Sequence, residues 1–254
     1  MEKIWIKIVS TYSPGTIEVT GTLLTQLTTY LLLALVFMPL DFSRLFILRD
    51  YQLRSTRKPL DFYIWRKFVI SALQNQLIVA LLHYVLLLIL RRLDFITSLC
   101  RITAETPSLG EVVADVVICT FSREVLFYYL HRFLHHPLIY HYFHKTHHQF
   151  TPPVALAGQH FHPVDYFLTG TLPVIIPAFL MRIHVVTMWL NIILVSTESF
   201  VVHCGYDFYG ILDLKPKSHD LHHKHSNVNF GVMGIMDYIH GTRFVEKTRS
   251  QLQK

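Results

Sequence analysis

Histidine is the residue type through which this sequence is equipped to do chemistry. Sixteen of the seventeen histidines lie between residues 131 and 240, and many of them recur at fixed spacing. His131 and His135 are four residues apart, and two further groups, at residues 144–148 and 219–223, share the pattern His-x-x-His-His. Residues three or four apart lie on one face of a helix. Each group can therefore aim two or three imidazoles at one point.

Converging imidazoles predict a metal site. Neutral imidazole is a common ligand of iron, zinc, copper and nickel, whereas a buried histidine that only packs needs a hydrogen-bond partner of its own. Eight imidazoles exceed what one metal ion uses. We therefore expect a binuclear site built from the eight histidines of the three groups. Asp165 and Asp220 are candidates to orient histidines by accepting hydrogen bonds from their free N–H groups.

Other chemical signatures are absent from the sequence. It contains no HExxH, GxSxG, GxGxxG or GxxxxGK[ST] motif. Carboxylates near the histidine groups are too few for a carboxylate-rich di-iron bundle. The three cysteines are scattered and suggest neither a disulfide framework nor a zinc finger. Histidines outside the groups are expected at the surface or at an interface, namely His141, His160, His184 and His240.

Long apolar runs must position the histidine groups. The chain is 52% hydrophobic and only 16% charged, with a mean hydropathy of +0.36. Residues 23–40 and 68–90 predict two membrane spans, and residues 166–181 and 185–202 predict an apolar helical hairpin. The stretch 112–130 is ambiguous, because charged residues interrupt an otherwise apolar helix. The N-terminus lacks the apolar core and cleavage site of a secretory signal peptide.

These elements predict an all-α integral membrane protein with four or five membrane-embedded helices and a cytosol-facing helical cap that carries the histidines. Residues 1–120 would form an N-terminal membrane region with a basic loop, and residues 121–254 a catalytic domain. The loop at residues 41–67 carries seven Lys and Arg and should be cytoplasmic. If the histidines share that face, residues 112–130 must cross the membrane; the alternative is that they lie at the interface.

The net charge of +6 and the isoelectric point near 9.2 do not indicate a nucleic-acid partner. The cations sit beside apolar runs, as Arg91 and Arg92 do directly after residues 68–90. Juxtamembrane anchoring explains this placement better than phosphate binding.

Several motifs together resemble a known family. They are HRFLHH, HKTHHQFTPP, HFHPVDY, HCGYDF, SHDLHHKHSNVNFG and MDYIHGT, and they extend over roughly residues 121–242. In order and spacing they resemble the fatty acid hydroxylase and sterol desaturase superfamily of membrane enzymes, closest to its C4-methylsterol oxidase-like, fatty acid hydroxylase domain-containing members. Two positions depart from the usual pattern, since Asp165 stands where Glu is usual and Met236 where Trp is usual. Both bear on substrate shape more than on chemistry.

The resemblance implies a non-haem centre of two iron ions held only by histidines. It also implies O2 as oxidant and electrons from NAD(P)H through a separate cytochrome b5 or its reductase. Carried over residue by residue, it gives His203 and His162 as further ligands beside the eight of the groups. The implied metal ligands are His131, His135, His144, His147, His148, His162, His203, His219, His222 and His223.

The resemblance implies O2-dependent oxidation of a lipid in the membrane, as by a methylsterol oxidase. A fatty-acyl or sphingolipid hydroxylase or desaturase is the alternative on the same scaffold, with a sterol or an acyl chain entering from the bilayer. From another class, a histidine-rich metal transporter or sensor is the rival. The endoplasmic reticulum, with the histidines facing the cytosol, is the default location.

Overall fold

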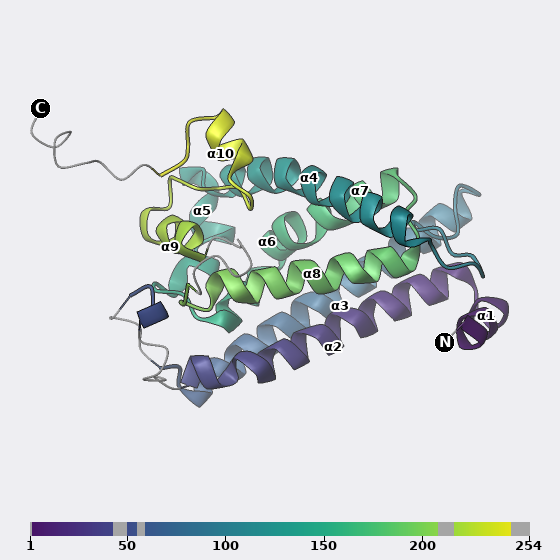
Figure 1. Ribbon diagram of the computed structural model, residues 1–254, viewed down its shortest axis with the longest axis horizontal. Coiled ribbons are helices and arrows are strands. Elements are labelled where there is room, and N and C mark those ends of the chain that lie inside the picture. Colours follow the sequence, from purple (N-terminus) through teal and green to yellow (C-terminus); the bar gives the residue numbers. More distant parts are fainter. Residues whose placement is uncertain (1, 43–49, 55–58, 208–215, 245–254) are drawn as a thin grey trace, which may run out of the picture.

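Five long helices lie side by side in the computed structural model, which describes residues 2–42, 50–54, 59–207 and 216–244 (Figure 1). A short amphipathic helix, α1 (Glu2–Thr11), precedes them. The long helices are α2 (Pro14–Phe42), α3 (Phe62–Arg92), α4 (Leu109–Leu134), the continuous run of α6 (Pro163–Asp165), η4 (Tyr166–Thr171) and α7 (Leu172–Leu180), and α8 (Val185–His203). The described residues form no strand beyond two isolated bridges.

Four of these helices are long and apolar enough to cross a membrane: α2, α3, the run Pro163–Leu180 and α8. The predicted all-helical fold with four or five membrane-type helices is confirmed. Side chains on the outer faces of α2 and α3, such as Leu35 and Leu81, are apolar and exposed, while polar residues such as Asn75 point inward and are buried. An apolar exterior around a partly polar interior is the arrangement that a lipid environment favours.

The ambiguous stretch 112–130 lies within α4, a helix as long as its neighbours. Ser108 caps its N-terminus by accepting a hydrogen bond from the Glu111 N–H. The helix packs against α7 and α8 and exposes an apolar face that includes Val117 and Phe121. It returns the chain from the end where α3 finishes to the end that holds the histidines (Figure 1). It is also continuous across residue 120, where we expected the domain boundary.

The basic loop and the histidines lie at the same end of the bundle. The Asp41 carboxylate accepts hydrogen bonds from the backbone N–H groups of Ala155 and Leu156, 3.0 and 3.3 Å away. Arg54, in the loop, forms an ion pair with Asp220 of α9 (Pro216–His225) at 2.7 Å. Four of the seven predicted basic residues lie outside the described residues, namely Arg44, Arg49, Arg57 and Lys58.

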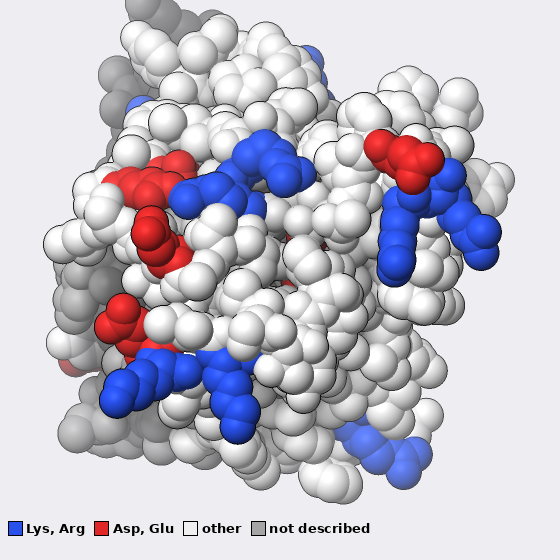
Figure 2. Space-filling model, turned by 90° about the vertical axis from the view of Figure 1, so that its right-hand side faces the viewer, with Lys and Arg blue, Asp and Glu red and all other residues white. Residues whose placement is uncertain are grey.

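The opposite end of the bundle carries charges of both signs (Figure 2). It includes the α3–α4 connector, in which Arg101 pairs with Glu111, and the turn before α8, where Arg182 donates to the Ser98 carbonyl. The apolar helices therefore end in charged groups on both sides, as membrane-spanning bundles do.

Candidate metal centre

Five short or terminal segments bring histidines to one end of the bundle. His131 lies in the last turn of α4 and His135 caps that helix. His144 follows α5 (Pro137–Phe143), and the next two histidines form the single turn η2 (His147–Gln149). The last residue of α8 is His203. Helix α9 supplies His219, His222 and His223.

Nine of the ten predicted ligands gather in two groups. The possible ligand atoms within each group all lie within 4.8 Å of one another. The first group consists of His131, His135, His144, His148 and His222. The second group consists of His147, His203, His219 and His223.

Each His-x-x-His-His pattern is divided between the two groups. His144 and His148 join the first group while His147 joins the second. The reason is that neighbouring residues point in different directions, about 100° apart on α9 and further apart in the tight turn η2, so adjacent histidines cannot aim at one point. Each pattern therefore aims two of its three imidazoles at one point and the third at the other group.

Within each group the Nε2 atoms face one another. In the first group the Nε2 atoms of His131 and His144 are 3.1 Å apart, as are those of His135 and His222. In the second group the Nε2 atoms of His219 and His203 are 2.8 Å apart. These distances bring nitrogen atoms together at points where a small cation would contact several of them.

The outward Nδ1 atoms fix the tautomer of several of these rings. His131 Nδ1 lies 2.7 Å from the Phe230 carbonyl, His222 Nδ1 2.7 Å from the Val228 carbonyl, and His203 Nδ1 2.7 Å from the Ser199 carbonyl. A carbonyl oxygen only accepts, so each Nδ1 must carry the proton. A neutral ring then has a lone pair on Nε2. Facing lone pairs repel unless a cation lies between them, so the residues present fit a bound metal.

Burial keeps these rings neutral. Burial, followed by the nearby imidazoles of His144 and His131, lowers the pKa of His148 to about 2. Burial also lowers the pKa values of His147 and His223 well below the usual histidine value, followed by the nearby imidazole of His203 for His147 and of His219 for His223. Neutral imidazole is the form that binds metal.

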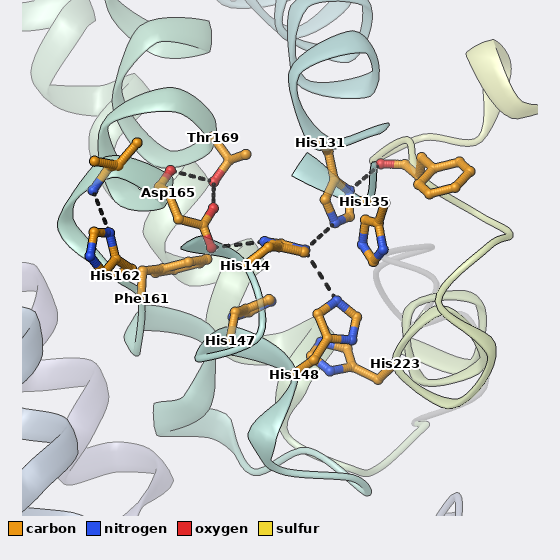
Figure 3. Close-up of polar contacts among 12 residues, drawn as sticks. His131, His135, His144, His147, His148, Phe161, His162, Asp165, Thr169 and His223 are labelled. Atoms are coloured by element: carbon orange, nitrogen blue, oxygen red, sulfur yellow. Dashed lines mark hydrogen bonds and ion pairs between the residues drawn. The ribbon is translucent and has the colours of Figure 1, made fainter. Parts of the chain in front are cut away.

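His162 lies apart from both groups (Figure 3). Its Nδ1 accepts a hydrogen bond from the Val164 N–H at 3.2 Å, which caps α6, and its ring packs against Phe143 at 5.2 Å. Asp165 Oδ2, by contrast, lies 2.8 Å from His144 Nδ1, and its Oδ1 accepts from the Thr169 hydroxyl (Figure 3).

Asp220 has a different partner. Its Oδ2 and its backbone carbonyl both accept hydrogen bonds from the Arg54 guanidinium at 2.7 Å. This pair connects α9, which carries three of the histidines, to the basic loop. A contact between residues so far apart in sequence could not be read from local spacing.

Two carboxylates that were not predicted at the site, those of Glu124 and Asp237, stabilise the loop next to the first group. Glu124 accepts hydrogen bonds from the backbone N–H groups of Val232, Met233 and Met236. Asp237 accepts from the N–H groups of Phe230 and Gly231. They hold the loop whose carbonyls contact His131 and His222. In the sequence, Glu124 stands out only as an acidic residue within an apolar helix, and this says nothing about which groups hydrogen-bond to it.

Two histidines expected at the surface or an interface are buried instead. His184 caps α8 and its ring packs against Trp5 at 5.8 Å. His160 packs against Phe68 at 4.7 Å. Aromatic neighbours from distant segments cover both rings. His141 and His240 are exposed.

A cavity leads from the histidines into the bundle. His131 and His144 of the first group line it, together with His147, His203 and His219 of the second. On α8 the lining extends from Met188 to His203, about 22 Å at the rise of a helix. Both groups therefore adjoin a space that is long enough for an extended apolar molecule and is lined mainly by apolar side chains.

This fold and this histidine arrangement define a class of protein, and the sequence comparison identifies it. Residues 116–242 match the Fatty acid hydroxylase family, and the chain belongs to that family. The predicted superfamily is confirmed.

Among its relatives, fatty acid hydroxylase domain-containing protein 2 of Homo sapiens is 38% identical over 145 residues, covering 56% of this chain and 42% of the relative. Methylsterol monooxygenase 1-2 of Arabidopsis thaliana is 33% identical over 162 residues, covering 58% and 54%. Very-long-chain aldehyde decarbonylase GL1-10 of Oryza sativa subsp. japonica is 33% identical over 146 residues, covering 54% and 48%. The matches span about half of each relative's length. No solved structure matches this chain significantly.

Proposed function

We propose that this protein is a membrane-bound lipid oxidoreductase whose centre holds two non-haem iron ions. The observation that carries the proposal is the pair of inward-facing Nε2 groups at the end of a largely apolar cavity. The first group would hold one ion and the second group the other. When bound, the irons would supply O2 activation, by which one oxygen atom enters a C–H bond and donor electrons and protons reduce the other to water.

The chain's own residues would hold the metal ions, orient the histidine rings and shield the centre from water. Carbonyls of Phe230, Val228 and Ser199 keep the Nδ1 protons in place, so the Nε2 lone pairs stay available. The Asp165 carboxylate does the same for His144 and makes that imidazole a stronger donor. Burial of the rings excludes water, and the apolar lining of the cavity admits a lipid chain.

Among lipid substrates we favour a methylsterol, in keeping with the name of the Arabidopsis thaliana relative. A fatty-acyl or sphingolipid hydroxylase or desaturase is the alternative, since other relatives are named as a fatty acid hydroxylase and an aldehyde decarbonylase. A metal transporter or sensor is less well supported, because the histidine groups lie at one end of the spans. His83, which lies inside a span, hydrogen-bonds to Glu18.

We further propose that the histidine end faces the cytosol at the endoplasmic reticulum and receives electrons there from cytochrome b5 or its reductase. Arg66 and Lys67 add positive charge to this end, which would favour an acidic donor. Tags inserted between α2 and α3 and after Lys254 should both be accessible from the cytosol. Tags on opposite sides would contradict this orientation.

The deciding experiment is metal and product analysis of the purified protein in lipid nanodiscs. We expect about two irons per chain and O2-dependent oxidation of a sterol or acyl lipid when cytochrome b5, its reductase and NAD(P)H are supplied. Exchangeable zinc without turnover would instead support the transporter or sensor. The variant His141→Ala is the matched control, because that histidine is exposed and outside both groups.

A further inference from the structure

Polar side chains form a band across the cavity between the histidines and its apolar far end. We call this set the polar band; it consists of Gln26, Gln76, Arg123, Ser196 and Glu198, all of which line the cavity. Beyond it the lining is mostly apolar, with Leu23, Val79, Val174 and Ile192, and it ends at Thr22 and the His83 ring, which pairs with Glu18.

Helix geometry places the members of the polar band at similar depth. On α8, Glu198 precedes His203 by five residues, about 8 Å, and on α4 Arg123 precedes His131 by eight residues, about 12 Å. Helices α2 and α3 meet through the hydrogen bond between Glu18 and His83.

From that bond, eight residues along α2 lead to Gln26 and seven residues back along α3 lead to Gln76, about 12 and about 11 Å. The two amides therefore lie level with each other. Both amides lie on the side of the Glu18–His83 hydrogen bond that faces the histidine end of the cavity.

Gln76 has an unused hydrogen-bonding atom. Its side chain is only 2% exposed, and the described part of the chain offers its Oε1 no hydrogen-bond partner. Its neighbour Asn75 donates to the Phe161 carbonyl, and the Phe161 ring stacks on His147 at 4.3 Å. A buried amide oxygen without a partner is costly. Its position in the cavity wall points to a ligand that donates a hydrogen bond.

Arg123 and Glu198 add a charged pair at the same depth. They form an ion pair between α4 and α8, and their side chains are 12% and 17% exposed. Ionisable groups at this depth in a membrane bundle usually mark a binding path. One ion pair leaves both groups with further capacity, because a guanidinium has five N–H donors and a carboxylate accepts several hydrogen bonds.

We infer that the polar band binds the polar group of an amphipathic lipid. The lipid carries a hydroxyl or amide N–H near the carbon that reaches the histidines, and its apolar remainder fills the far end of the cavity. Gln76 accepts the hydrogen bond, and the Arg123–Glu198 pair orients the same group. The identity of the reacting carbon rests on the proposed function, whereas the binding preference does not.

The test compares two ligands that differ in one donor: hexadecanol and its methyl ether, which keeps the oxygen and the chain but lacks the O–H. Affinities are measured in nanodiscs by competition with a fluorescent fatty alcohol. The wild-type protein should bind the alcohol about tenfold more tightly, the effect of about one hydrogen bond. Gln76→Met should remove the preference through weaker alcohol binding. Leu77→Met, at a 53% exposed neighbour on the outer face, should keep it.

Equal affinity of the wild-type protein for the two ligands would overturn the inference, and so would a preference that survives in Gln76→Met. The wild-type comparison decides the matter even if the variant does not fold. If the wild-type protein prefers the alcohol but oxidises no lipid, the proposed function is wrong and the assignment of the polar band stands. If the protein oxidises lipid but binds the alcohol and the ether equally, the assignment of the polar band is wrong and the proposed function stands.

Discussion

Replacing Asp165 by Asn tests whether the two histidine groups are separate metal positions. Asp165 is fully buried, and its Oδ2 lies 2.8 Å from His144 Nδ1. The substitution keeps the shape of the side chain but removes the charge that strengthens this hydrogen bond. His144 belongs to the first group, and among the described residues Asp165 forms no hydrogen bond with a histidine of the second.

The expected loss follows from the role of such a carboxylate. Removing a partner that orients a metal-binding histidine costs about 10- to 100-fold in metal affinity, which is about 1.4–2.7 kcal/mol. At limiting free iron we therefore expect Asp165→Asn to fall from about two irons per chain toward one. Raising free iron by the same factor should restore the second ion.

The assay is metal analysis after equilibration against buffered iron, with Glu18→Gln as control. Glu18 Oε1 lies 2.8 Å from His83 Nε2, so this control removes the charge of a buried carboxylate–histidine contact outside both groups. The control should lower stability and leave the iron content unchanged. Equal loss of both ions in Asp165→Asn, or full retention at limiting iron, would refute the assignment of His144 to one of two separate positions.

Three further predictions concern the same end of the molecule. His147→Ala should abolish activity and lower the metal content, whereas His141→Ala should retain most of both; comparable losses would indicate a general folding requirement. Metal-free protein should lose stability as pH falls below about 6.5, because buried rings such as His148 stay neutral in the folded state while the same rings bind protons in the unfolded state. The loss is about 1.4 kcal/mol per pH unit for each such ring. Thermal melting of chelated protein between about pH 7 and 5 measures this loss, and a melting temperature that does not change with pH would contradict it. Arg54→Ala should weaken iron binding by freeing α9, with Arg54→Lys recovering part of it, and an unchanged metal affinity in Arg54→Ala would show that the ion pair with Asp220 does not position the site.

The sequence predicts the spans well because apolar runs dominate them. Helices α2 and α3 nevertheless extend beyond the apolar runs at residues 23–40 and 68–90, to Pro14–Phe42 and Phe62–Arg92. The extra turns contain polar residues that hydropathy discounts. Glu18 is an example of such a residue. Its carboxylate can be buried because it forms hydrogen bonds with His83 and the Cys100 N–H, and both partners are distant in sequence.

The convergence of nine histidines was predictable, but their division into two groups was not. The pattern at residues 144–148 predicts a helix, whereas His147 and His148 lie in a tight single turn. The supporting loop was also beyond sequence reasoning. A Cβ at Gly231 would lie 2.8 Å from the Glu124 Oε1 atom, so the close approach of that loop to α4 depends on a glycine whose role only the folded chain shows.

The carbonyls that hold His131 and His222 belong to Phe230 and Val228, near the end of the described chain. A ribosome must therefore translate the chain as far as residue 230 before the first group has its ligands and their acceptors. By then all five long helices of the bundle have been synthesised, because the last of them, α8, ends at His203. A metal ion can therefore occupy the complete first group only after α9 and the loop that follows it have been made, and a chain arrested before α9 would contain the apolar helices but neither complete histidine group.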